Sequence, residues 1–300
     1  MAQLTLTVAP SQSGRAVRSL LKNELGLSTA CINRLKRTEF GLMCNGHRVF
    51  TNAIVSTGDV LTVEIDAASR PTENISPIEM PLDIVFEDDY LLVINKSAPL
   101  SVIPSSFAPD EPTLANALAH HLGDSFTYHP VNRLDRGTTG LMVVAKNGFI
   151  HDRLRRALHS GTFFRRYLAV CVGTLDPAAG EITLPIGRRE GSAIARCVTE
   201  DGQPAHSSYR TLEHTDRFSL VELTPHTGRT HQLRVHMAAI SHPLVGDWLY
   251  GTEDHSLITR PALHAAELSV QHPITGTTIS LTAPLPADMK RLLEFSSCLN

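Results

Sequence analysis

The feature that most constrains how this chain folds is an acidic residue between two arginines. A glycine-rich turn and an apolar run follow it at once. Asp135 lies between Arg133 and Arg136, and residues 137–140 (Gly-Thr-Thr-Gly) lead into the apolar residues 141–145. A short apolar run bounded by turn residues predicts a buried strand, so the acid is expected on a turn that enters a rigid core element. Two guanidinium groups favour the ionised form of an acid between them. Such an acid suits a nucleophile or an electrostatic stabiliser better than a general acid.

On spacing alone the same residues also fit a surface ion pair, which is the more common arrangement. The string Asn132-Arg133-Leu134-Asp135-Arg136 and the Gly-Thr-Thr-Gly after it, however, resemble the signature of RluA-family pseudouridine synthases. The usual form in that family is His-Arg-Leu-Asp-Arg-X-Thr-Ser-Gly, so Asn132 replaces a His and Thr139 replaces a Ser. The resemblance implies that Asp135 is the catalytic residue. The replacement of the usual His by Asn132 affects only a hydrogen-bonding role near Asp135.

A second string begins at Arg165-Arg166-Tyr167 and ends at Gly173. The pattern predicts a strand over residues 167–172 that opens on Tyr167. A tyrosine there fits a core position, and it also fits an RNA site, where an aromatic face stacks on a base and an adjacent arginine contacts a phosphate. The string resembles the family's Arg/Lys-X-Tyr-X-Ala-X-Val-X-Gly. The resemblance implies that Tyr167 stacks on the target base, and Arg165 and Arg166 become candidate substrate-binding residues.

A third string, residues 227–236, reads Thr-Gly-Arg-Thr-His-Gln-Leu-Arg-Val-His. Thr230 is a natural cap residue, so a helix is expected to begin beside Arg229 and to offer an anion site at its N-terminus. Ordinary surface arginines on a helix are the alternative interpretation. The string is very similar to the family's Thr-Gly-Arg-Thr-His-Gln-Ile-Arg-Val-His. In related synthases an Arg pairs with the catalytic Asp, and we assign that role to Arg234, with Arg229 as second candidate. A bidentate pair would also orient the carboxylate of Asp135.

The similarity to the family extends over about residues 82–290. It includes residues 242–251, for which we predict a turn after the helix with Trp248 and Tyr250 packed against it. One family segment is altered, because residues 95–104 (Asn-Lys-Ser-Ala-Pro-Leu-Ser-Val-Ile-Pro) lack the Gly and the His of the family's usual string. That difference is expected to change the shape of a loop near the RNA entrance.

The N-terminal 66 residues are predicted to form a separate unit. Apolar spacing predicts a helix over residues 13–25, and Ser28 is placed to cap a second helix. Asn45-Gly46 is a strong hairpin signal, and strands are expected at 49–50 and 60–65. This unit resembles an S4-type RNA-binding module. Its candidate RNA-binding residues follow the cap in the second helix: Arg34, Lys36 and Arg37. A small structural domain with a solvated basic face is the alternative. Residues 67–80 read as a linker and 81–300 as a second domain.

Composition limits the possible partners and compartment. The formal net charge is −3, yet seven Lys and Arg stand against two Glu over residues 11–50, and eight against two Asp over residues 133–166. Local positive surface is what phosphate contact requires. We expect no membrane span and no signal peptide. The five scattered cysteines indicate free thiols and a cytoplasmic protein; they are Cys31, Cys44, Cys171, Cys197 and Cys298.

A metal site is not expected, because His226, His231 and His236 recur every five residues. This spacing gives no shared ligand face on a helix or a strand. The chain also lacks the closely spaced cysteine pairs that commonly bind zinc.

The expected fold class is α+β: a small N-terminal S4-like α/β module, then a catalytic domain with a mixed, mainly antiparallel sheet and flanking helices. The resemblance implies isomerisation of uridine to pseudouridine in structured ribosomal or transfer RNA, without a cofactor. A non-catalytic RNA-binding or ribosome-assembly protein on the same fold is the alternative, and a nucleoside hydrolase is disfavoured because such enzymes use two carboxylates. A monomer with no obligatory protein partner is the default expectation. The candidate substrate-binding residues are Arg133, Arg136, Arg165, Arg166 and Arg229.

Overall fold

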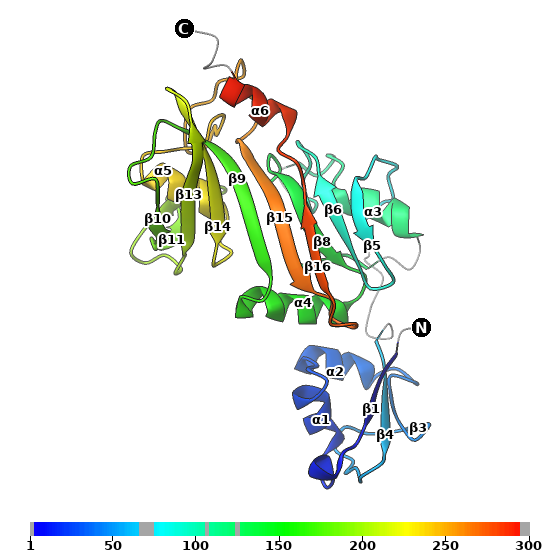
Figure 1. Cartoon of the computed structure of the whole chain (residues 1–300). Helices are drawn as coiled ribbons and strands as arrows, with labels where there is room; N and C mark the ends of the chain where they lie inside the picture. Colours follow the sequence, from blue (N-terminus) through cyan, green and yellow to red (C-terminus); the bar gives the residue numbers. More distant parts are fainter. Residues whose placement is uncertain (1–2, 66–74, 106–107, 124–126, 295–300) are drawn as a thin grey trace.

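The computed structural model describes residues 3–65, 75–105, 108–123 and 127–294. It contains a small N-terminal sheet and a much larger second sheet, drawn at opposite ends of the molecule in Figure 1. Residues 67–74 of the predicted linker and Cys298 lie outside the described residues. No helix in the described ranges is long and apolar enough to cross a membrane.

The N-terminal part pairs a four-stranded sheet with two short helices. The sheet has the order β1–β4–β2–β3, and its strands are β1 (Gln3–Thr7), β2 (Leu42–Cys44), β3 (His47–Arg48) and β4 (Val60–Glu64). The turn η1 (Pro10–Gln12) precedes α1 (Val17–Asn23) and α2 (Thr29–Leu35). The predicted cap is confirmed, since the Ser28 hydroxyl accepts from the Cys31 amide. The hairpin turn at Asn45-Gly46 is confirmed as well, with positive φ at both residues.

Two N-terminal predictions need correction. Residues 13–16 do not belong to the first helix, because Ala16 is extended and acts as its N-cap. Residues 49–50 lie just outside a strand, because β3 ends at Arg48.

The large sheet is mainly antiparallel, as predicted. Its main path has the order β10–β13–β14–β9–β15–β8–β6–β5, with β16 paired to β15 and β7 paired to β8. The contact of β15 with β8 is its one parallel pairing among the described strands. The strands are β5 (Ile84–Glu87), β6 (Leu91–Lys96), β7 (His129–Pro130), β8 (Thr139–Ala145), β9 (Phe164–Val172), β10 (Ala179–Ile182), β13 (Ser207–His214), β14 (Phe218–Pro225), β15 (Leu263–Gln271) and β16 (Thr278–Thr282). A separate two-stranded ribbon consists of β11 (Ile186–Arg188) and β12 (Arg196–Val198).

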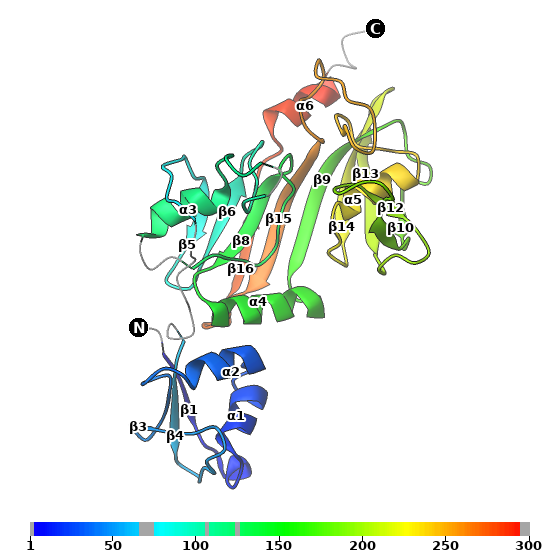
Figure 2. The ribbon, with the colours of Figure 1, turned by 180° about the vertical axis from the view of Figure 1, so that it is seen from behind.

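Four helices surround the large sheet. They are α3 (Leu114–Leu122), α4 (Gly148–Ser160), α5 (Gln232–Ala239) and α6 (Ala287–Glu294). Figure 2 shows α3 and α5 in front of the same face of the sheet, toward opposite edges, so that the central strands lie between them. The helix α4 runs across one end of the strands and α6 lies at the other end.

The predicted buried strand at residues 141–145 is confirmed and lies at the centre of the sheet. Every residue from Leu141 to Ala145 is buried in β8. Met142 and Val144 join the apolar cluster on one face, whereas Leu141 and Val143 join the cluster on the other. Burial on both faces explains why this strand reads as a continuous apolar run and not as an alternating one.

The parallel contact of β8 with β15 depends on a glycine. Gly140 has a φ of 108°, and a Cβ at this position would lie 2.3 Å from the carbonyl oxygen of Ala265. Only glycine combines this backbone conformation with so close an approach. The turn that carries Asp135 therefore enters β8 at a point where the backbones of two central strands almost touch.

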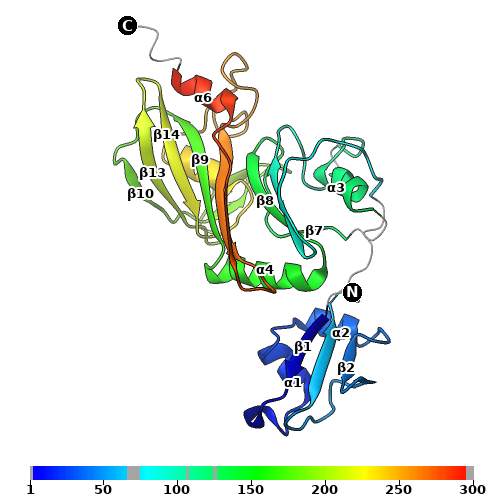
Figure 3. The ribbon, with the colours of Figure 1, turned by 45° about the vertical axis from the view of Figure 1, so that its right-hand side comes forward.

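The N-terminal part contacts the rest of the chain through α4, and buried residues of both parts belong to one apolar cluster. The Ser28 hydroxyl donates to the carboxylate of Asp152, and the Arg153 guanidinium donates to the carbonyl oxygen of Leu25 at 3.0 Å. Figure 3 shows α2 directly beneath α4. Arg34 lies in this contact, because a Cβ on Gly148 would be only 2.9 Å from its guanidinium.

Three further predictions, all about residues 81–300, need correction. Tyr167 does not open its strand, because β9 begins at Phe164. Thr230 is not the cap of α5, since His231 takes that position, and the Gln232 side-chain oxygen accepts from the Arg229 amide at 2.9 Å and closes the turn. Trp248 is not packed, because 53% of it is exposed.

Substitution of Gly140 tests the role of this close approach. We expect Gly140→Ala to lower the free energy of unfolding by about 3 kcal/mol or more, because backbone strain and overpacking add. Gly276→Ala is the matched control, since Gly276 has a φ of 73° but open space around it, and should cost about 1 kcal/mol. Urea unfolding of both variants measures the difference. Equal losses would contradict the assigned role of the Ala265 contact.

Candidate active site

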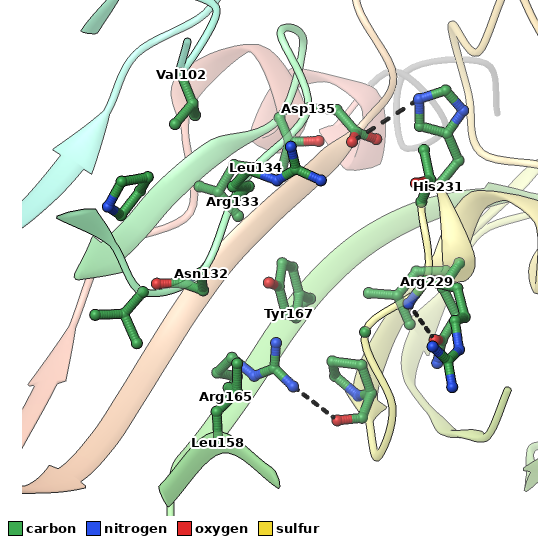
Figure 4. A pocket seen from close by; sticks show the side chains of 18 of the residues that line it. Val102, Asn132, Arg133, Leu134, Asp135, Leu158, Arg165, Tyr167, Arg229 and His231 are labelled. Atoms are coloured by element: carbon green, nitrogen blue, oxygen red, sulfur yellow. Dashed lines mark hydrogen bonds and ion pairs between the residues drawn. The ribbon is translucent and has the colours of Figure 1, made fainter. Parts of the chain in front are cut away.

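A cavity of about 890 Å³ brings together the three strings that the sequence singled out. It is lined by residues 128–136 and 138, by Arg165 and Tyr167 of β9, by residues 225–234, and by one side of α4. These segments meet above the central strands on the face that carries α5. Figure 4 shows side chains that line this space, with Tyr167 between Asp135, Arg165 and the loop of Arg229.

Asp135 occupies a turn between β7 and β8. Its carbonyl oxygen accepts from the Thr138 amide at 3.0 Å, which closes the turn. One carboxylate oxygen, Oδ2, lies 3.2 Å from Nη1 of Arg234, and the other, Oδ1, lies 3.9 Å from Nε2 of His231. Among the described residues, neither Arg133 nor Arg136 makes an ion pair with this carboxylate. Arg136 instead makes a bidentate pair with Glu111 at 3.0 Å, and Arg133 is exposed.

Arg234 is the third residue of α5 and is almost fully buried. Its Nε and Nη2 atoms each lie 2.7 Å from an oxygen of Asp247, whose side chain is completely buried. The bidentate pair expected with Asp135 is thus made with Asp247, and Asp135 receives only the remaining nitrogen. Burial lowers the pKa of Arg234, but the two carboxylates outweigh burial and raise it above its ordinary value. The site therefore holds a permanent cation beside Asp135.

Tyr167 lies on the floor of the cavity. It packs in the same apolar cluster as Leu134, Leu233 and Leu263 and is nearly inaccessible to solvent. Burial raises the pKa of its phenol, so the ring stays uncharged at neutral pH. Figure 4 shows the ring between the segment of Asn132 and the loop of Arg229. It can offer an aromatic face to a planar ligand.

The two arginines before Tyr167 lie on different faces of β9. Arg165 lines the cavity with Tyr167, and its guanidinium donates to the carbonyl oxygen of Pro225 at 3.4 Å. Arg166 points to the other face, where it pairs with Glu222 at 2.7 Å and Glu267 at 2.5 Å. The prediction that Arg166 binds substrate in this site is therefore wrong, because side chains alternate across a strand.

Arg229 lines the rim of the cavity and does not reach Asp135. Its Nε donates to the carbonyl oxygen of Pro204 at 3.0 Å, and its Nη1 donates to the side chain of Gln203 at 2.8 Å. Of the two candidates, Arg234 alone contacts the acid. Of the three N-terminal candidates for RNA binding, Arg34 is not free to contact RNA, because its guanidinium lies against Gly148 of α4. Lys36 and Arg37 are exposed.

Sequence reasoning missed Lys96, which is 1% exposed at the end of β6. Its Nζ donates to the carbonyl oxygens of Ser97 and Leu100 at 2.8 Å and of Arg136 at 3.4 Å. Burial lowers its pKa to about 7, and the nearby Asp135 carboxylate opposes that shift. The lysine ties the altered segment after β6 to the turn of Asp135. A lone lysine ending an apolar run was the available signal.

Asp247 and Tyr250 were also missed as site residues. Asp247 accepts from the backbone amides of Leu249 and Tyr250 in addition to Arg234. The ring of Tyr250 lies 5.1 Å from the guanidinium carbon of Arg234. The signal was the acid in Gly246-Asp247-Trp248, which we took for part of a structural turn.

Asn132, which stands where the family's string has a His, makes a structural contact. Its side-chain oxygen accepts from the Val143 amide at 2.9 Å, so it fixes the segment before Asp135 against β8. Among the residues that the structure describes, no cluster of His, Cys, Asp and Glu is arranged to hold a metal ion.

Comparisons with known proteins show which family this chain resembles in sequence and in fold. Residues 90–239 match the sequence model of the RNA pseudouridylate synthase family. The chain is 40% identical to "Uncharacterized RNA pseudouridine synthase YjbO" of Bacillus subtilis, over 90% of this chain and 96% of that protein. It is 38% identical to "Ribosomal large subunit pseudouridine synthase D" of Yersinia pestis, over 97% and 94%. The solved structure "Human RNA Pseudouridylate Synthase Domain Containing 1" matches with a TM-score of 0.58 and 27% identity, over 73% of this chain and 95% of that one.

Removal of the buried counter-charge of Arg234 should destabilise the protein. We expect Asp247→Asn to lower the free energy of unfolding by about 3 kcal/mol, because an unpaired buried guanidinium remains. Glu111→Gln is the matched control, since it breaks an exposed bidentate pair with Arg136 and should cost less than about 1 kcal/mol. Urea unfolding at neutral pH compares the two. A loss of less than about 1 kcal/mol for Asp247→Asn would contradict the central role of this pair.

Proposed function

Because this chain belongs to the RNA pseudouridylate synthase family, we propose that it isomerises specific uridines in ribosomal or transfer RNA with Asp135 as the catalytic residue. One observation carries the assignment of Asp135. Within the described residues it is the one carboxylate that lines the cavity, and Arg234 holds it through a single oxygen. Its second oxygen, Oδ1, faces His231 across the cavity.

The reaction is chemically self-contained. The bond between N1 of uracil and C1′ of ribose breaks, the base turns, and a bond forms between C5 and C1′. C5 loses a proton and N1 gains one, so atoms and electrons balance without an oxidant or a group donor. No cofactor is therefore part of the proposal. A fixed carboxylate beside the ribose supplies the negative charge that such a reaction requires.

The target uridine must leave its stack to reach Asp135, because the carboxylate lies inside a cavity and not on an open surface. We assign Tyr167 the role of a stacking platform for the extruded base. Its position in the cavity lining and its uncharged phenol support that role. Arg133, Arg165 and Arg229 line the same cavity, and they are suited to contact phosphates of the flanking nucleotides.

We further propose that residues 1–66 are an S4-like RNA-binding module. Lys36 and Arg37 are exposed beside α2 and remain candidates for phosphate contact. Arg34 is withdrawn from this set because it lies against Gly148 in the contact with α4. The name of the Yersinia pestis relative makes large-subunit ribosomal RNA the first substrate to test.

A non-catalytic RNA-binding protein on this fold is the alternative. It would have no need of a buried Arg234 aimed at Asp135 by a second carboxylate. A nucleoside hydrolase would need a second carboxylate across the cavity. Asp247 does not serve, because it is completely buried behind Arg234.

Maps of pseudouridine in cellular RNA test the function. We expect at least one site in ribosomal or transfer RNA to disappear on deletion of the gene and to return with the wild-type gene. Asp135→Asn should fail to restore it, whereas Glu111→Gln should restore it, because Glu111 pairs only with the exposed Arg136. If no site depends on the gene, the RNA assignment fails. If Asp135→Asn restores the site, the catalytic assignment fails.

Charge removal from the N-terminal part tests its RNA role. We expect Lys36→Gln with Arg37→Gln to weaken RNA binding severalfold and to reduce the slope of log affinity against log salt by about 1 to 2. Lys290→Gln with Arg291→Gln is the matched control, since both residues are exposed on α6 at the far end of the molecule. Titrations at several salt concentrations measure both slopes. Equal slopes for the two variants would contradict an RNA role for this part.

A further inference from the structure

His231 is held in an unusual backbone conformation at the edge of the cavity. It is the N-cap of α5 with a φ of 56° and a ψ of 20°, a left-handed conformation that few residues other than glycine adopt. Its side chain is 16% exposed and lines the cavity beside Asp135. Non-glycine residues in this conformation occur where the surrounding structure holds them, and they cluster at functional sites.

Tyr250 contacts Nδ1 of His231, which leaves Nε2 as the ring nitrogen nearest to Asp135. The phenol oxygen of Tyr250 accepts from the backbone amide of Arg196 at 2.9 Å and lies 2.7 Å from Nδ1 of His231. Because the phenol already accepts from Arg196, its own O–H is available to donate to Nδ1. A neutral imidazole that accepts at Nδ1 carries its proton on Nε2. In that tautomer the donor atom of His231, Nε2, is the one that faces Asp135.

Tyr250 is itself fixed by the same residue that fixes Arg234. The Oδ1 atom of Asp247 accepts from the backbone amide of Tyr250 at 3.3 Å and from Nη2 of Arg234 at 2.7 Å. The ring of Tyr250 also makes an edge contact with the imidazole of His231. A single buried carboxylate thus orients both side chains that face Asp135, one directly and one through Tyr250.

His231 and Asp135 lie close enough for one ligand atom beside them to contact both side chains. Nε2 lies 3.9 Å from Oδ1, which is too far for a direct hydrogen bond. Oδ1 has no hydrogen-bond donor among the described residues, because Arg234 contacts Oδ2. Figure 4 shows the two side chains facing each other across the cavity. A donor held this close to a reactive carboxylate is in reach of a group that the carboxylate approaches.

We propose that His231 is a further catalytic residue, whose Nε2–H donates a hydrogen bond to an oxygen atom of the reacting nucleotide beside Asp135, with Tyr250 as the positioning residue that fixes this tautomer. The proposal rests on the proposed function of the cavity. A neutral donor is suited to this place because a cation there would pair with Asp135 itself. Burial lowers the pKa of His231, Asp135 opposes that shift, and Arg234 adds to it.

Charged and titratable groups surround the imidazole on every side. They are Asp135 on its turn, Arg234 in α5, Asp247 and Tyr250 in the loop after α5, and Arg196 in β12. On acidification the imidazole becomes a cation that faces the Asp135 carboxylate. We expect this charge to draw the two side chains together and to close the gap that the nucleotide requires. Wild-type activity should therefore decline on acidification, at a pH below the ordinary titration range of histidine because burial lowers this pKa.

Two substitutions of His231 and a cycle with Tyr250 test the proposal, with RNA that carries a uridine identified by the maps described above. We expect His231→Leu to lower kcat about 100-fold, as for loss of one fixed donor, with KM within about twofold because most RNA affinity comes from phosphate contacts. His231→Gln retains an N–H donor that does not titrate, so it should recover most of kcat and lose the acid decline. Tyr250→Phe should lower kcat in the wild-type background and have no further effect in His231→Leu. Tyr209→Phe, which removes the hydroxyl of a phenol outside the cavity, is the control.

Three outcomes would overturn the inference while leaving the proposed function intact. One is an unchanged kcat in His231→Leu when the wild type converts uridine. Another is a His231→Gln variant as impaired as His231→Leu with the same pH profile, and a third is independent, multiplicative effects of the two substitutions. Thermal melting of each variant separates loss of folding from loss of the donor. Failure of the wild type to convert any uridine would instead overturn the proposed function, and this inference with it.

Discussion

The buried pair of Arg234 and Asp247 is the interaction on which the rest of the site depends. A guanidinium and a carboxylate taken out of water are costly unless their geometry is nearly ideal and the remaining donors and acceptors are used. Here the pair is bidentate at 2.7 Å, and the carboxylate also accepts two backbone amides. The guanidinium has one nitrogen left over, Nη1, and that nitrogen reaches Asp135. The cation is therefore positioned by a partner that takes no part in binding.

The turn that carries Asp135 is fixed from two sides in a similar way. Lys96 holds the carbonyl oxygen of Arg136 on one side. On the other side the guanidinium of Arg260 contacts the carbonyl oxygen of Gly137 at 3.4 Å and pairs with Asp288 of α6. Both side chains are buried, and both contact backbone oxygens of the turn, of which that of Arg136 also accepts from the Leu100 amide at 3.0 Å. Helices and strands far from the cavity thus determine where one carboxylate lies.

The sequence predicted local features well where a feature depends only on residues close together in the chain. Ser28 caps a helix, Asn45-Gly46 forms a hairpin, and the apolar residues 141–145 form a buried strand, because each depends on neighbours in the chain. The contact of Arg234 with Asp135 spans 99 positions, and the family resemblance, not the spacing, suggested it. Arg166 was misplaced because β9 begins three residues earlier than predicted, and the alternation of its faces then separates Arg165 from Arg166. Arg34 could not be placed from the sequence, since its partner surface belongs to another domain.

The number of partners that each side chain has distinguishes Asp135 from the ion pairs around it. Three buried polar side chains are held by short hydrogen bonds to other protein groups: Arg234, Asp247 and Lys96. Such a network resists rearrangement, because breaking any member leaves a buried group without a partner. Asp135 differs, because only Oδ2 is held and Oδ1 faces a donor 3.9 Å away. That oxygen is open to the cavity, since 29% of the Asp135 side chain is exposed. The rigid polar network thus holds the carboxylate through Oδ2 and leaves Oδ1 accessible, which is the arrangement that the proposed function of Asp135 uses.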